Sequence, residues 1–259
     1  MLLGQLDVVQ AEPAAKTDLL RCHDADYLEL LERLDHAVLL DQNTIASETS
    51  WDACLLAAGA AIEAAVRGGF ALVRPPGHHA RTSAQSGFCL VNNIAIAARA
   101  AQERLGVERV AIVDFDVHHG DGTQEIFRDD PSVLCASMHQ YWPPLFPGTG
   151  GPDEQGETTV NVPMRGGDGD AEFLEAFDER IAPAVVHFEP DLVLVSAGFD
   201  AHVEEEIYRK ETRVTEAGFR ELAQRCAALG PRVAAVLEGG YNLETLPTLV
   251  AAAVEGFSL

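Results

Sequence analysis

The sequence predicts an α/β fold with a central, mostly parallel sheet and helices on both faces. Five short apolar runs, each suited to a buried strand, alternate with longer stretches of helical periodicity. Reactive polar side chains follow each run within a few residues, as expected where parallel strands bring their carboxyl ends to one edge of a sheet. The 259 residues, 47% of them hydrophobic, suffice for one substantial core, so we expect a single domain over residues 1–259.

The expected elements follow in order along the chain. Asp24 is expected to cap a helix with Tyr27 and Leu31 on its apolar face, and Ser50 to cap a long alanine-rich helix that stops at residues 68–69. The expected strands cover residues 70–73, 110–113, 133–137, 192–196 and 233–237. Further helices are expected at 92–105, 171–188 and 215–229, and Pro183 should kink or split the second of these.

Composition limits the classes of partner. The net charge of −23 repels nucleic acid phosphates and anionic membranes, and it favours cationic partners or a salty cytoplasm. An acidic surface that is simply solvated explains this charge more readily than a specific acidic interface does. The five scattered cysteines form no CxxC pair, which indicates a reducing cytoplasm. No secretory signal pattern is evident, and the longest apolar stretch, residues 55–73, carries Glu63 and Arg67, so no membrane span is expected.

A candidate metal site follows the strand at residues 110–113. Asp114, Asp116 and His118 are spaced by two, so they point the same way while the chain stays extended. Asp200 ends the turn SAGFD after another expected strand, where Gly198 permits a sharp bend. Two carboxylates and one imidazole suit Zn²⁺ or Fe²⁺. The spacing Asp-x-His is common, and on its own it more often contains a histidine of the core than a metal ligand. Here the polar loops that follow the other strands at the same edge favour a metal site.

Candidate acid–base groups follow the first strand. His78 and His79 come after a rigid Arg-Pro-Pro-Gly turn, and adjacent imidazoles serve as base and acid when carboxylates set their tautomers. Asp114 and Asp121 are available for that task. The alternative is a pair of surface histidines. Tyr241, in a Glu-Gly-Gly-Tyr segment, offers a phenol to a developing oxyanion, although such a segment on its own is usually just a turn.

Seven motifs taken together resemble the histone deacetylase family, and they occur in the family's order from about Leu19 to the end of the chain. The motifs are RPPGHHA (74–80), SGFCLVNN (86–93), DFDVHHGDGTQ (114–124), FPGTG (146–150), NVP (161–163), SAGFDAH (196–202) and EGGYN (238–242). The RPPGHH and EGGY forms are similar to the class II and bacterial branch, which includes acetylpolyamine amidohydrolases. The resemblance implies an arginase–deacetylase fold.

The resemblance also implies roles for individual residues. Zinc would be held by Asp116, His118 and Asp200. His79 would be the general base and acid, supported by His78, and Tyr241 would polarise the acyl carbonyl. Asp114 would pair with His78, and Asp121 with His79. The implied tunnel and rim residues are Phe88, Phe146, Gly87, Gly240 and the acidic rim residue Asp41.

A structural potassium ion is implied behind the zinc. Its ligands would be Asp114, the Ser137 hydroxyl and the main-chain carbonyls of Asp116, His118 and Met138. A second monovalent cation site would use the carbonyls of Phe127, Asp130 and Val133.

Two departures from the family pattern concern the pocket. Family members usually carry several tens of residues before the point where this chain begins, and these supply an early strand and part of the pocket wall. After SAGFDAH the family often shows a GDP-and-glycine loop, whereas residues 203–212 here are VEEEIYRKET. The three glutamates at 204–206 either face the pocket mouth and favour substrates with extra positive charge, or form a solvated acidic loop.

The sequence therefore predicts a zinc-dependent amidohydrolase that removes an acyl group, in the simplest case acetyl, from a small-molecule or peptide amine. Protein lysine, polyamine and metabolite amides all remain open as substrates. A ureohydrolase of the arginase type shares the fold, but it would require a second metal and more aspartate ligands. A non-catalytic module that binds acylated ligands is the alternative outside enzymes.

Overall fold

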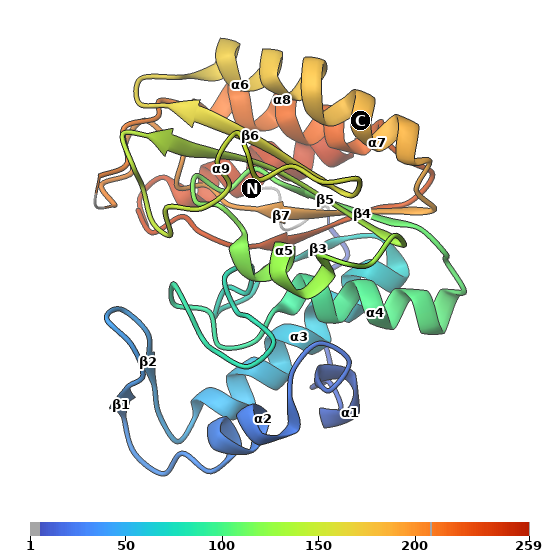
Figure 1. Ribbon diagram of the computed structural model, residues 1–259, viewed down its shortest axis with the longest axis vertical. Coiled ribbons are helices and arrows are strands. Elements are labelled where there is room, and N and C mark those ends of the chain that lie inside the picture. Colours follow the sequence, from blue (N-terminus) through green and yellow to red (C-terminus); the bar gives the residue numbers. More distant parts are fainter. Residues whose placement is uncertain (1–5, 208, 259) are drawn as a thin grey trace.

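The computed structural model describes residues 6–207 and 209–258, and it has a sheet between two helical layers (Figure 1). The sheet contains six parallel strands in the order β3-β8-β7-β4-β5-β6. Their bounds are β3 (Phe70–Ala71), β4 (Val110–Asp114), β5 (Val133–Trp142), β6 (Thr159–Arg165), β7 (Leu192–Ala197) and β8 (Val233–Leu237). The predicted α/β class with a parallel sheet is confirmed.

Helices cover both faces of the sheet. One layer, below the sheet in Figure 1, contains α3 (Ser50–Arg67), α4 (Asn93–Leu105) and α5 (Asp121–Phe127), with α1 (Lys16–Leu19) and α2 (Ala25–Glu32) outside them. The other contains α6 (Asp170–Ala176), the π-helical turn η1 (Phe177–Ile181), α7 (Ala182–Phe188), α8 (Glu216–Ala227) and α9 (Leu246–Phe257). A short hairpin of β1 (Val38–Leu39) and β2 (Ile45–Ala46) stands apart from the sheet.

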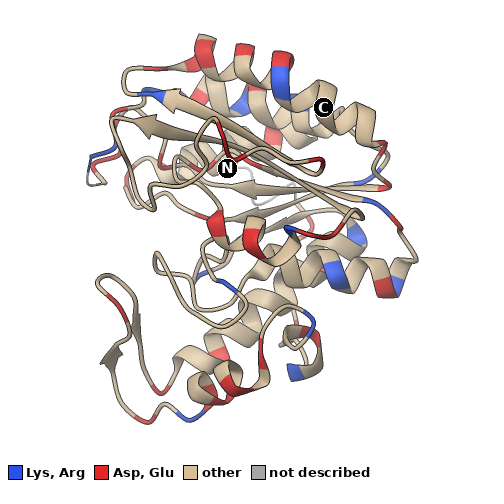
Figure 2. Ribbon diagram, viewed as in Figure 1, with Lys and Arg blue, Asp and Glu red and all other residues tan. Residues whose placement is uncertain are grey.

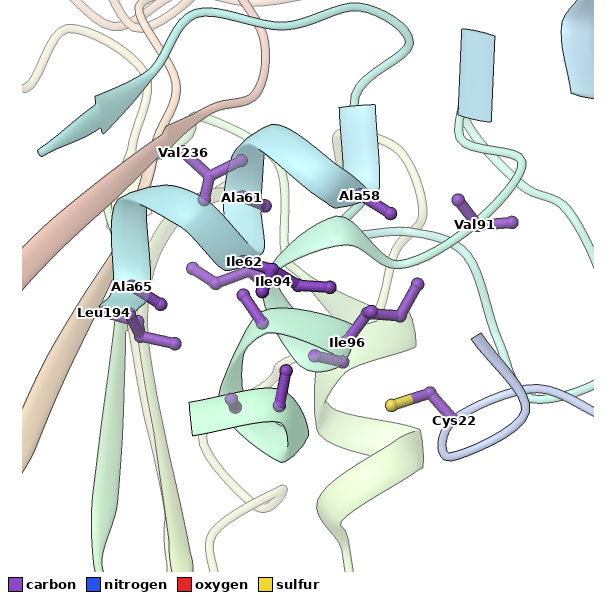
Figure 3. Close-up of a cluster of buried hydrophobic side chains, with 14 of the residues drawn as sticks. Cys22, Ala58, Ala61, Ile62, Ala65, Val91, Ile94, Ile96, Leu194 and Val236 are labelled. Carbon is purple, nitrogen blue, oxygen red and sulfur yellow. The ribbon is translucent and has the colours of Figure 1, made fainter. Parts of the chain in front are cut away.

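Side-chain alternation along the strands divides the core in two. In β4, Val110 and Ile112 belong to the cluster under α3 and α4, whereas Ala111 and Val113 belong to the cluster under α6–α9. Successive side chains of a strand point to opposite faces, so a run buried on both sides is apolar throughout. Figure 3 shows the first cluster, in which Ile62 of α3 meets Ile94 of α4. This explains why the sequence shows apolar runs rather than alternation.

Several boundaries differ from the sequence expectations. The long helix begins at Ser50, but its N-cap is Thr49. Asp24 is the N-cap residue of α2 as expected, although its side chain accepts a hydrogen bond from Ser83 (2.7 Å) and none from the helix. The expected helix at 171–188 is divided by η1, and Pro183 lies in the first turn of α7, where a missing N–H is tolerated. Six elements were not predicted: α1, β1, β2, α5, β6 and α9.

The acidic composition is visible on both helical layers. Figure 2 shows Asp and Glu distributed over α2, α5 and the helices above the sheet, with few Lys or Arg beside them. Within residues 6–207 and 209–258, no helix is long and apolar enough to cross a membrane.

Candidate metal centre and acid–base site

The candidate metal ligands lie where the strand order reverses. β4 pairs with β7 in parallel, and Asp114 at the end of β4 is in register with Ser196 in β7. The chain leaves β4 through α5 on one face of the sheet and leaves β7 through α8 on the other. A crevice at such a switch point is where open α/β sheets bind ligands. The loops after β4 and β7 therefore bring Asp116, His118 and Asp200 together.

The three side chains form a compact, buried cluster. One potential ligand atom from each of them lies within 4.8 Å of the other two. Nδ1 of His118 is 3.0 Å from Oδ1 of Asp116 and 3.0 Å from Oδ2 of Asp200. That Oδ2 is fully buried, yet it accepts no hydrogen bond from any residue that the structure describes. An orphaned carboxylate oxygen beside an imidazole nitrogen and a second carboxylate fits a divalent cation.

Hydrogen bonds orient the two carboxylates. Oδ1 of Asp200 accepts from the main-chain N–H of Val117 (3.0 Å), and Oδ2 of Asp116 accepts from that of Gly239 (2.7 Å). Each carboxylate is thus fixed by the loop of another strand. Such partners hold metal ligands in place before the ion binds.

The electrostatics of the cluster favour a positive charge at its centre. Burial and the neighbouring Asp116 carboxylate raise the pKa of Asp200 to about 6. Burial opposes the charged form of His118, but the negative charges of Asp200 and Asp116 outweigh it and raise its pKa to about 9. Two buried carboxylates around one imidazole therefore favour a cation between these three side chains.

Two imidazoles, each bonded to a carboxylate, lie next to this cluster. Nδ1 of His78 is 2.9 Å from Oδ2 of Asp114, and Nδ1 of His79 is 2.7 Å from Oδ1 of Asp121. The ring centroids of His78 and His79 are 4.0 Å apart, and those of His79 and His118 are 5.9 Å apart. The structure thus brings together the pairs that the sequence resemblance implied.

The protonation of His79 suits a base. Burial and the adjacent His78 lower the pKa of His79 to about 3, so its ring is neutral. Burial opposes ionisation of Asp121, but the bonds from His79 and from Arg81 (2.7 Å) outweigh it and lower its pKa to about 2. An ionised Asp121 accepts from Nδ1–H of His79, which leaves Nε2 with a free lone pair.

Glu238 fixes the loop that carries these histidines, a role that the sequence did not reveal. Its Oε2 accepts from the main-chain N–H groups of Gly77 (2.6 Å) and His78 (3.1 Å), and its Oε1 from the Ser196 hydroxyl (3.3 Å). Burial raises the pKa of Glu238 to about 7. The sequence did show a carboxylate directly after a buried strand. A carboxylate buried at such a position requires hydrogen-bond donors.

Tyr241 lies at the far end of the same segment. Its ring packs edge-on against Phe88, with 5.5 Å between centroids, and the guanidinium of Arg74 lies 5.4 Å from its centroid. Burial and the charges of Asp200 and Asp116 raise the pKa of Tyr241 well above its ordinary value, so the phenol keeps its proton. Gly240 has a φ of +114°, in the region that favours glycine. This glycine lets the chain turn between Glu238 and Tyr241.

The two tunnel aromatics each contact one of the reactive groups. The ring centroids of Phe146 and His79 are 5.0 Å apart, and Phe88 packs on Tyr241. Both side chains remain partly exposed, at 40% and 39%, so they reach the surface beside these groups. A Cβ on Gly87 would overlap the His79 ring, so a larger residue there would displace the imidazole.

Asp41 is connected to Phe88 through the β1–β2 turn. Oδ1 of Asp41 accepts from the N–H groups of Asn43 (2.9 Å) and Thr44 (2.8 Å), and the Thr44 hydroxyl accepts from the N–H of Phe88 (3.1 Å). Asp41 is half-buried at the end of this chain of contacts. The rim role that the resemblance implied for Asp41 stays a prediction.

Two of the implied potassium ligands, Asp114 and Ser137, line a small cavity together with Asn161. Nε2 of His139 lies 2.9 Å from the Gly150 carbonyl, which can only accept, so this nitrogen carries the proton. Nδ1 of His139 then accepts from the Ser137 hydroxyl (2.9 Å). The lone pairs of that hydroxyl stay available for a cation. Met138 follows it in β5.

The second implied cation site falls in one turn between α5 and β5. The carbonyl of Phe127 accepts from Asp130 N–H (3.0 Å), and that of Asp130 from Val133 N–H (3.3 Å). Arg99 pairs with the Asp130 carboxylate at 2.6 Å. The three carbonyl-bearing residues therefore lie close together along the chain.

A family model described as a histone deacetylase domain matches residues 1–257. The chain belongs to the histone deacetylase family. It is 40% identical to "Histone deacetylase 10, chloroplastic" of Oryza sativa over 97% of its own length and 63% of that protein. It is also 40% identical to "Polyamine deacetylase HDAC10" of Mus musculus, over 93% of its own length and 40% of that protein. The chain spans less than two thirds of either relative.

This histone deacetylase family member also matches a solved structure. The crystal structure of the HDA15 HD domain superposes with a TM-score of 0.92 at 38% identity, covering 96% of this chain and 74% of that one. The fold implied by the sequence resemblance is thereby confirmed.

Proposed function

We propose that the protein is a divalent-metal-dependent amidohydrolase that removes an acyl group, in the first instance acetyl, from an amine at the end of an alkyl chain. The observation that carries the proposal is the buried Asp116–His118–Asp200 cluster beside the imidazole of His79, with ring centroids of His79 and His118 5.9 Å apart. A water-activating site and a base in contact are the two requirements of this hydrolysis.

The proposed metal is Zn²⁺, with Fe²⁺ as the alternative that the same donors accept. Asp116, His118 and Asp200 would hold it, and the orphaned Oδ2 of Asp200 supports this assignment. When bound, the cation supplies Lewis acidity that activates water and polarises the amide carbonyl. A potassium ion at Asp114 and Ser137 would have a structural role.

His79 would move the proton in this mechanism. Its free Nε2 accepts a proton from the attacking water, while Asp121 stabilises the imidazolium that forms. The same Nε2–H then protonates the leaving amine. His78, bonded to Asp114, lies beside this pair and would support it.

Tyr241 would act on the carbonyl oxygen. Its phenol keeps its proton and donates to the oxygen as negative charge develops there. Phe88 and Phe146 would flank an alkyl chain between the surface and the reactive groups, and Asp41 would accept a hydrogen bond from the substrate at the rim.

The proposed substrate is an acylated amine with additional positive charge. The name of the mouse relative points to polyamines, and the net charge of −23 attracts cations to this protein. The five cysteines are free and buried, which supports the expected cytoplasmic, reducing setting.

Acetate release tests the proposal. Purified protein, with and without a chelator and with Zn²⁺ or Fe²⁺ restored, is screened against N-acetylated polyamines and an acetyl-lysine peptide. We expect metal-dependent acetate release, faster for the polyamines at low salt than at high salt. Binding without turnover would instead identify a binding module, and urea release from arginine would identify a ureohydrolase.

A further inference from the structure

We infer that Glu205 is a positioning residue for Tyr241: its carboxylate sets the main-chain path that places the phenol. The inference rests on the proposed function, in which Tyr241 acts on the carbonyl. Glu205 belongs to the 203–212 segment, where the sequence departs from the family pattern.

The contact is made by one carboxylate oxygen. Oε2 of Glu205 accepts from the main-chain N–H of Tyr241 (2.7 Å) and from that of Asn242 (3.0 Å). Two successive N–H groups that converge on one anion form charge-assisted hydrogen bonds, which are stronger than neutral ones. These two N–H groups lie outside any helix or strand, so the carboxylate supplies the partner that regular structure does not.

The segment from Glu238 to Tyr241 is held from its other side by Arg74. The guanidinium donates to the carbonyl of Gly240 (2.7 Å) and to that of Glu238, and it lies over the Tyr241 ring. The N–H of Gly239 is fixed by Asp116. Arg74 thus fixes carbonyl groups and Glu205 fixes N–H groups of one short turn. Loss of the Glu205 contacts frees the peptide plane that precedes the Tyr241 side chain.

The 203–212 segment is itself anchored to present Glu205. Nζ of Lys210 donates to the His202 carbonyl and lies 3.5 Å from that of Glu205, and the Asn242 side chain donates to the Glu204 carbonyl (2.9 Å). Oε1 of Glu205 accepts from the N–H of Glu206 (3.1 Å). The carboxylate therefore faces the tyrosine turn, and its neighbours Glu204 and Glu206 are the exposed acidic groups.

A displaced phenol would stabilise the transition state less well but would hardly change substrate binding, because the oxyanion exists only in the transition state. We therefore expect Glu205→Ala to lower kcat by roughly 10–100-fold with KM changed by less than about twofold. Glu205→Gln keeps an acceptor oxygen and should recover to within about fivefold of the unmutated protein. Glu206→Ala is the matched control, since it removes an exposed carboxylate one residue away.

A double-mutant cycle with Tyr241→Phe separates positioning from general support of the fold. If Glu205 acts through the phenol, Glu205→Ala should cost less than about twofold in the Tyr241→Phe background. The same loss in both backgrounds, or equal effects of Glu205→Ala and Glu206→Ala, would overturn the inference. Metal content should be unchanged in all variants.

A readout independent of activity is amide hydrogen exchange of the peptide that contains Tyr241 and Asn242. We expect faster exchange there in Glu205→Ala than in Glu206→Ala, and equal exchange would overturn the inference. If the unmutated protein releases no acetate, the proposed function fails, while exchange still decides whether Glu205 holds the turn.

Discussion

Gly198 lies so close to Asp116 that a Cβ on it would overlap Oδ2 of the carboxylate. The turn after β7 therefore packs directly on a ligand that follows β4. The absence of a side chain at position 198 is what lets the two loops approach.

Gly198→Ala should consequently disturb the metal cluster. We expect a loss of about 1–3 kcal/mol in the free energy of unfolding, as for other overpacked sites, together with a lower metal content. Urea denaturation and elemental analysis measure the two effects. Gly69→Ala is the control, because a Cβ there meets no atom within 4 Å. Normal metal content and stability in Gly198→Ala would contradict the close packing described here.

Tyr241→Phe tests the phenol alone. The phenyl ring keeps the packing against Phe88, so the variant should fold and retain its metal. We expect kcat to fall by roughly 10²–10³, the usual effect of removing one oxyanion donor. Steady-state kinetics on an acetylated amine measure this. Turnover at the rate of the unmutated protein would assign the oxyanion contact elsewhere.

Glu238 should make stability depend on pH. Burial raises its pKa to about 7, so the folded state holds this proton more tightly than the unfolded chain does. The resulting stabilisation is complete below the unfolded pKa of about 4.3 and is lost as the pH rises through the folded value. Relative to Glu238→Gln, the unmutated protein should lose up to about 3 kcal/mol between pH 5 and 8.

Urea denaturation of both metal-free proteins at intervals across this range measures the difference. Metal-free protein is used because metal affinity itself changes with pH. A stability difference that stays constant from pH 5 to 8 would show that Glu238 does not titrate there.

The sequence predicted the central strands and the residues behind them, for a physical reason. Buried parallel strands are continuous apolar runs, and the reactive side chains follow at their carboxyl ends. The edge strand β6 was missed because only part of it is buried and its pattern is mixed. The helix α5 was missed because Gly120 and Gly122, interpreted as a turn, lie at its N-cap and in its first turn. The nearly all-apolar α9 shows little polar periodicity.

The contacts between loops could not be predicted from the sequence. Glu238 and Gly77 are 161 positions apart, and Glu205 and Tyr241 are 36 apart, so no local pattern connects them. The shared direction of Asp116 and His118 could be predicted from their spacing. That Oδ2 of Asp200 is buried without a hydrogen-bond partner could be found only in the folded structure.

The central claim is that Asp116, His118 and Asp200 hold one divalent metal ion that acyl-amide hydrolysis requires. The most direct measurement is metal per chain together with acetate release, for the unmutated protein and for Asp200→Asn, which keeps the shape but removes the charge. We expect about one zinc ion per chain before the change and little after it, as for catalytic sites with three protein ligands, with acetate release lost in parallel. Full metal content and full activity in Asp200→Asn would contradict the claim.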